Sequence, residues 1–115
     1  MMSPIQIEEL LERVSGNRDF VIRMLELFFQ TSDERLSALH KEFDSRNYKE
    51  LADQVHKLKG IISNLSINKA LGILNDLHEA ARSKNDLHII RLLSELEETI
   101  IEAKIFYQKN PSLNL

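Results

Sequence analysis

Residues 51–65, which read LADQVHKLKGIISNL, decide the fold because their apolar side chains recur with the period of one helix face. Successive apolar positions are 4, 3, 4 and 3 residues apart, and at about 100° per residue they form one continuous stripe. The stripe consists of Leu51, Val55, Leu58, Ile62 and Leu65. We therefore predict an amphipathic helix that packs against other helices through this stripe.

One histidine lies on the opposite face of this predicted helix. His56 is about 150° from the centre of the stripe, on the solvent side. Gly60, one turn later, shares that outward face; Lys59 lies to one side, and Ser63 and Ala52 are near it. A glycine inside an exposed helix costs roughly 1 kcal/mol relative to alanine, and core packing does not require one there. Its missing side chain would leave clearance for a bulky partner beside the imidazole.

These residue types suit a phosphoryl acceptor. The ordinary pKa of histidine, about 6.5, leaves a neutral nucleophilic nitrogen available at neutral pH. Attack on a phosphoryl group also needs room for in-line approach and compensation of negative charge. His56, Gly60 and Lys59 supply one requirement each, with the lysine within reach at i+3. On spacing alone, however, a plain solvated histidine is the more common explanation for such a residue.

The rest of the chain also follows a helical pattern, with only three glycines and two prolines. The expected helices cover residues 4–14, 20–46, 48–65, 69–84 and 87–108. Ser3, Pro4 and Gln6 resemble a capping box for the first helix. Asp19 and Asn68 are expected to cap the second and fourth helices, and Asn47 and Asp86 to start the third and the last. The fold class is therefore all-α: an antiparallel up-down-up-down four-helix bundle with a short extra N-terminal helix.

Apolar periodicity also selects the side chains of the other helices that are expected in the core. In the second helix they are Phe20, Val21, Met24, Leu25, Phe28, Leu36, Leu39 and Phe43. In the fourth they are Leu71, Leu74 and Leu77, and in the last they are Ile89, Ile90, Leu93, Leu96, Ile100 and Ile101.

Composition narrows the possible functions. A net charge of −3 gives no electrostatic footprint for nucleic acid, and no apolar run is long enough for membrane insertion. The absence of cysteine excludes thiol chemistry, and no nucleotide-binding motif is present. A metal site built on Asp53 and His56 would need side chains that point into the bundle. His56 is predicted to point outward, so we do not expect this site. We expect one cytoplasmic domain over residues 1–115, without metal or cofactor, that is not an enzyme and takes its phosphoryl group from another protein.

The segment HKLKG, from His56 to Gly60, resembles the signature of the histidine phosphotransfer (HPt) domain family. In that signature the histidine is followed by any residue, an apolar residue, lysine and glycine. The similarity covers nearly the whole chain, from about Ile5 to about Ile105. It includes MLELFF at 24–29, RNYKEL at 46–51, and the apolar and acidic positions Leu71, Leu74, Leu77 and Glu79.

The resemblance implies that His56 is the phosphoacceptor, that Lys59 helps to hold the phosphoryl oxygens and that Gly60 keeps the site open. The implied partner is the receiver domain of a response regulator or hybrid histidine kinase, which supplies its own Mg²⁺. Family members present an apolar docking patch around the histidine. Candidates for such a patch here are Ser63, Phe29 and Ile22, although the last two could equally belong to the core. A monomer is the simplest expectation.

The chain departs from the family pattern at three positions after the glycine. Ile61 and Ile62 stand where small residues are common, and Ser66 stands where glycine is common, which leaves the end of this helix open. Two alternatives to phosphotransfer stay open. One is an HPt-like adaptor that docks a signalling partner without carrying phosphate. The other is a purely structural bundle, which leaves Gly60 unexplained.

Overall fold

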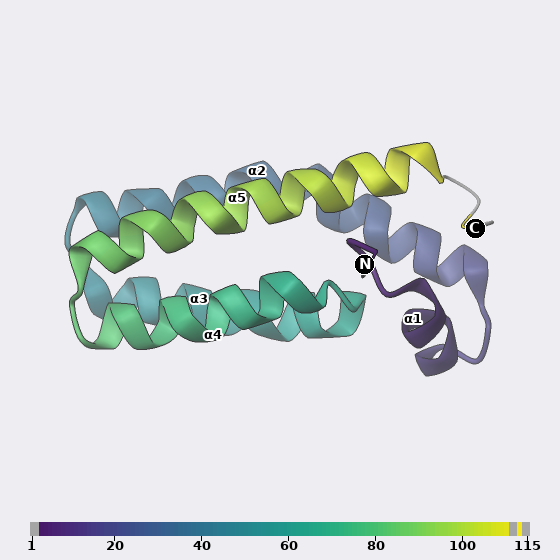
Figure 1. Cartoon of the computed structure of the whole chain (residues 1–115), viewed down its shortest axis with the longest axis horizontal. Coiled ribbons are helices and arrows are strands. Elements are labelled where there is room, and N and C mark those ends of the chain that lie inside the picture. Colours follow the sequence, from purple (N-terminus) through teal and green to yellow (C-terminus); the bar gives the residue numbers. More distant parts are fainter. Residues whose placement is uncertain (1–2, 111–112, 114–115) are drawn as a thin grey trace.

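The computed structural model describes residues 3–110 and residue 113, and the secondary structure of these residues is helical throughout. The five helices are α1 (Ile7–Arg13), α2 (Arg18–Asp44), α3 (Tyr48–Leu65), α4 (Asn68–Arg82) and α5 (Asp86–Lys109). Helix α2 lies beside α5 and α3 lies beside α4, with successive long helices running in opposite directions (Figure 1). The predicted four-helix bundle with a short extra N-terminal helix is confirmed.

Helix α1 lies at the end of the bundle where α2 and α5 extend past α3 and α4 (Figure 1). Its Ile7 and Leu10 are buried, as is Ile5 in the segment before it. Helix α3 contacts both α2 and α4, so two of its sides are covered and a third faces solvent. Within the described residues, no helix is long and apolar enough to cross a membrane.

The predicted stripe of α3 is buried at all five positions. Three other expected core residues are exposed instead: Phe20 by 48%, and Ile90 and Ile101 by 53% each. Ile90 and Ile101 lie about three turns apart on one line of α5, at the edge of an apolar face that is wider than the surface covered by α2 and α4. Phe20 lies in the first turn of α2, where the adjacent Val21 points into the core in its place.

The predicted capping box at the N-terminus is wrong, because no helix begins at Ser3 and the Gln6 side chain donates to the Ser3 carbonyl instead of accepting from the Ser3 N–H. Helix α1 begins only at Ile7, without a side-chain cap. The backbone N–H of Gln6 donates to the Ser66 carbonyl at 3.0 Å, and its side-chain oxygen accepts from the Asn68 N–H at 3.1 Å. Gln6 thereby supplies a cap to α4. Asn68, which was predicted to be the cap, is instead the first residue of this helix.

The other three helix starts are capped by asparagine side chains. Asn47 caps α3 as predicted, accepting from the N–H of Glu50. Helix α2 is capped by Asn17, not by the predicted Asp19, because the Asn17 side chain accepts from the Phe20 N–H at 3.1 Å. Helix α5 begins at the predicted Asp86, and its cap is the preceding Asn85.

A polar contact joins α3 to α5 at the opposite end of the bundle from α1. The hydroxyl of Tyr48 donates a hydrogen bond of 2.6 Å to the carboxylate of Asp86, which also pairs with Arg46 at 3.3 Å. This hydrogen bond, with smaller contributions from desolvation and the Asp86 charge, raises the pKa of Tyr48 above its ordinary value of 10.0.

Candidate functional site

The side chain of His56 is exposed on the solvent side of α3, opposite the buried stripe. Gly60, one turn later, is also exposed, and a Cβ atom at this position would meet no other atom within 4 Å. The backbone of Gly60 is ordinary α-helix, so neither conformation nor packing requires glycine at this position. The surface beside the imidazole is therefore open along the helix.

Lys59 lies three residues after His56 and is half-buried. Among the described residues, no hydrogen bond or ion pair engages its ammonium group. At about 100° per residue, Lys59 projects about 60° from His56, toward the same side as Ala52. Its charge is thus available to an anion held on the side of His56 that faces α4.

The face of α3 that carries His56 is not open on every side. Ala52, which the sequence places near that face, is only 8% exposed because α4 covers it. Helix α4 also brings His78 next to His56, with the two ring centroids 6.2 Å apart. The imidazole of His56 therefore lies at the margin between the α3–α4 contact and solvent.

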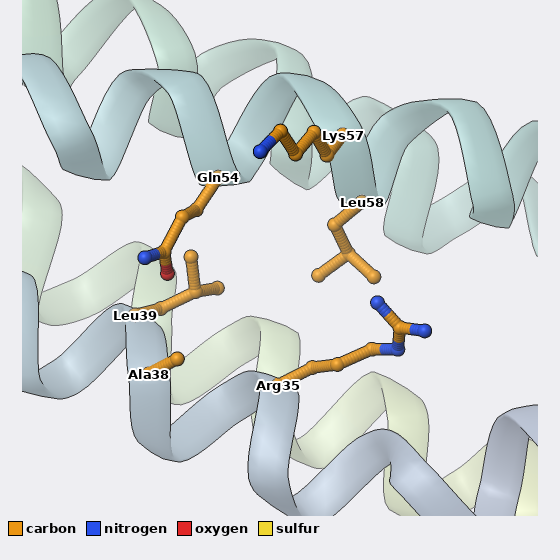
Figure 2. Close-up of a pocket in the computed structure, with 6 residues that line it drawn as sticks. All are labelled: Arg35, Ala38, Leu39, Gln54, Lys57 and Leu58. Carbon is orange, nitrogen blue, oxygen red and sulfur yellow. The ribbon is translucent and has the colours of Figure 1, made fainter.

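A groove runs along the other side of α3, between α3 and α2. At one point Gln54, Lys57 and Leu58 of α3 face Arg35, Ala38 and Leu39 of α2 (Figure 2). Further along, toward the end of α3, the lining becomes more apolar. There it comprises Met24, Leu27, Phe28, Thr31, Arg35, Ile61, Asn64 and Leu65. Leu27 is 63% exposed and adds apolar surface beside this part of the groove.

The three docking candidates chosen from the sequence occupy different environments. Phe29 is core: it is only 6% exposed and packs against Phe28 and Tyr107 at ring-centroid distances of 5.4 and 5.6 Å. Ile22 and Ser63 are half-buried. Phe29 therefore contributes no surface to a partner.

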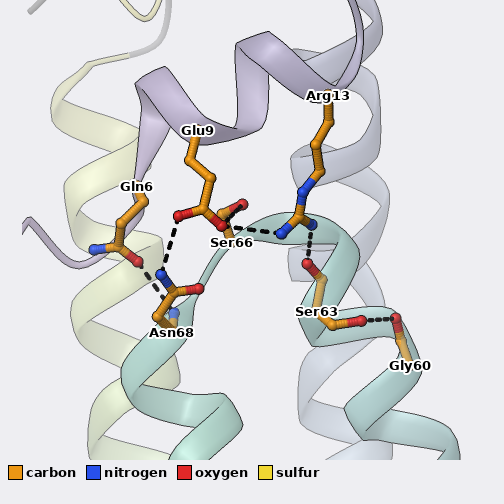
Figure 3. A network of polar contacts seen from close by, with 7 residues as sticks. All are labelled: Gln6, Glu9, Arg13, Gly60, Ser63, Ser66 and Asn68. Atoms are coloured by element: carbon orange, nitrogen blue, oxygen red, sulfur yellow. Dashed lines mark hydrogen bonds and ion pairs between the residues drawn. The ribbon is translucent and has the colours of Figure 1, made fainter.

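A polar network fixes the end of the histidine helix (Figure 3). Ser66 ends α3 in the left-handed conformation, with φ of 54°, and its hydroxyl donates to the Glu9 carboxylate at 3.2 Å. Glu9 also accepts from the side chain of Asn68 at 3.3 Å and pairs with Arg13 at 2.9 Å. Arg13 in turn donates to the carbonyl of Ser63. Contacts from α1 thus stabilise Ser66 in a left-handed conformation that glycine adopts more readily.

The remaining histidines are separate from this site. His40 of α2 lies 3.6 Å from a Glu97 carboxylate oxygen, and His88 lies in the first turn of α5. In the part of the chain that the structure describes, no group of three or more His, Cys, Asp or Glu side chains is placed to hold a metal ion.

Sequence reasoning missed two contributors to this surface. His78 has no histidine three or four residues away, so only the packing of α4 against α3 reveals its position beside His56. Leu27 is separated from the histidine helix by about half of α2, and its exposure depends on which line of α2 faces α3. Both features are tertiary and leave no local signal.

A comparison with known families matches the Hpt domain over residues 23–104. No curated protein and no solved structure matches the chain significantly. The matched segment extends from the second turn of α2 into α5 and contains the whole of α3 and α4. The chain therefore belongs to the Hpt domain family, whose members are histidine phosphocarriers of two-component phosphorelays rather than enzymes.

Proposed function

We propose that His56 accepts a phosphoryl group from the phosphoaspartate of one receiver domain and passes it to the aspartate of another. The observation that carries this proposal is the exposed imidazole with an open surface at Gly60 one turn away. The position of Gly60 one turn from His56 gives that opening its significance, because the exposed Gly72 of α4 leaves similar space away from the imidazole.

The transfer is a displacement at phosphorus. A ring nitrogen of His56 forms the new N–P bond while the P–O bond to the receiver aspartate breaks and the carboxylate leaves. Transfer to the next receiver reverses these two events. Lys59 would offset the charge of the phosphoryl oxygens, and the Mg²⁺ that assists the reaction would belong to the receiver.

We propose that the receiver docks over the α2–α3 groove beside His56. Leu27 supplies exposed apolar surface there, and Ile61 and Asn64 line the groove from α3. The isoleucine at position 61, where small residues are common in the family, would then contribute to the choice of partner. Ser63 and Ile22, both half-buried, are proposed to lie at the rim of this surface.

Phosphorylation of the protein by a labelled phosphoreceiver tests the assignment. The wild type should gain acid-labile, alkali-stable label, and His56→Gln should gain none. His88→Gln is the matched control, since it removes an imidazole from a distant helix and should label normally. Label that persists on His56→Gln refutes the proposed acceptor. Receiver binding without any label would favour the adaptor alternative.

The docking surface has its own test. Leu27→Asp should weaken receiver binding and slow transfer while the fold is retained, because the wild-type side chain is largely in solvent. Leu87→Asp is the control: Leu87 is 81% exposed near the start of α5, and its replacement should leave transfer unchanged. Equal effects of the two variants would argue against docking on the α2–α3 side.

A further inference from the structure

A second imidazole stands next to the proposed phosphoacceptor. His78 of α4 and His56 of α3 have ring centroids 6.2 Å apart and planes inclined at 53°. The rings are not stacked, and no hydrogen bond joins them. The space between them is open to solvent on the His56 side, because His56 is exposed and His78 is half-buried.

The nitrogen donors of His78 are not engaged by other described side chains, since no hydrogen bond or ion pair of its ring is found among them. The ring lines a groove between α3 and α4 whose charged members are Lys49, Asp53, Arg82 and Lys84. Three of these four groups are cationic. The groove beside His78 is therefore mainly cationic, and Asp53 is the one opposing charge in its lining.

An imidazole has at least one N–H donor in either protonation state. A phosphoryl group on His56 would present three acceptor oxygens two bonds beyond the ring nitrogen, and the ring of His78, with its centroid 6.2 Å from that of His56, is a neighbouring donor on α4. Hydrogen bonds to charged oxygens are stronger than those between neutral groups. An N–H at this place would therefore stabilise the phosphorylated form of the protein relative to the free form.

We propose that His78 donates a hydrogen bond to the phosphoryl group carried by His56, so that α4 supplies a ligand in addition to Lys59 of α3. The inference rests on the proposed function, because it requires a phosphoryl group on His56. In this proposal His78 helps to retain the phosphoryl group, and His56 is the residue that attacks phosphorus.

The phosphotransfer equilibrium between a phosphoreceiver and this protein measures the effect. In His78→Ala the ratio of phosphorylated protein to phosphoreceiver should fall by about tenfold or more, as expected for one lost hydrogen bond to a charged group. His78→Gln keeps an N–H donor and should recover part of the loss. His88→Ala, which removes a histidine outside the site, should match the wild type.

Nuclear magnetic resonance of the wild type gives a second, independent readout that does not depend on a variant folding. The ring ¹⁵N and ¹H signals of His78 should move when His56 becomes phosphorylated, whereas those of His40 should not. Label on His56 with an unmoved His78 ring and an unchanged equilibrium would overturn this inference alone. Failure of His56 to accept label would overturn the proposed function, and this inference with it.

Discussion

Replacement of Gly60 by a residue with a side chain should raise the stability of the fold and lower the rate of phosphotransfer. Gly60 lies in the interior of α3, is exposed, and has no atom within 4 Å of the position of a Cβ. A side chain there meets no clash, so Gly60→Ala and Gly60→Gln should gain the helix preference of those residues, about 1 kcal/mol for alanine and slightly less for glutamine. For a chain of this size, that gain raises Tm by about 4 °C.

Phosphotransfer should change in the other direction. A longer side chain one turn from His56 would hold the receiver away from the imidazole, and a misplacement of even about 1 Å can slow a reaction by as much as 100-fold. We expect Gly60→Gln to transfer at least about tenfold more slowly than the wild type, with Gly60→Ala between them.

Gly72 provides a matched control within the same protein. It is also exposed, lies inside α4 and leaves open space, with no atom within 4 Å, where a Cβ would stand. Gly72→Gln should therefore stabilise the fold to a similar extent and leave transfer unchanged. Thermal unfolding and the initial rate of label transfer from a phosphoreceiver measure the two effects. Equal transfer rates in Gly60→Gln and Gly72→Gln would refute the argument from steric clearance.

Three further predictions concern the charge, the end of α3 and the far end of the bundle. Lys59→Ala should slow transfer about tenfold without lowering Tm, because it removes one charge-assisted hydrogen bond. Lys59→Arg should retain most activity. Global unfolding of Lys59→Ala would show that Lys59 has a structural role instead. Ser66→Ala should lose about 1 kcal/mol of unfolding free energy with the hydrogen bond to Glu9, whereas Ser66→Gly should be near neutral in chemical denaturation because glycine relieves the left-handed strain. The raised pKa of Tyr48 means that its hydroxyl stabilises the fold below pH 10 and loses this effect as the pH rises through the raised value; the stability difference between wild type and Tyr48→Phe should therefore shrink in strongly alkaline buffer, and a constant difference would contradict it.

The helix that carries His56 could be predicted well from its local sequence. Helix α3 has the predicted bounds, the predicted Asn47 cap and the predicted buried stripe. These features depend on short-range spacing and on capping chemistry, which act within a few residues. The outward position of His56 and the openness at Gly60 follow from the same spacing.

Features that depend on neighbouring helices were not predictable in this way. The periodicity of α5 includes Ile90 and Ile101 in an apolar face, but only the positions of α2 and α4 decide which edge of that face is covered. Gln6 has a favourable local spacing for a capping box, but its side-chain oxygen accepts from the distant Asn68 N–H rather than from the Ser3 N–H. The approach of His78 to His56 likewise arises from helix packing.

The polar network at the end of α3 depends on residues that lie outside the segment of family similarity. Its α1 members, Glu9 and Arg13, and the capping residue Gln6 all precede the segment that matches the Hpt family, residues 23–104. A fragment trimmed to that segment would lose these three side chains together with the buried Ile5 and Leu10. The packed structure thus extends beyond the segment of sequence similarity, with all of α1 and the first turn of α2 lying before that segment.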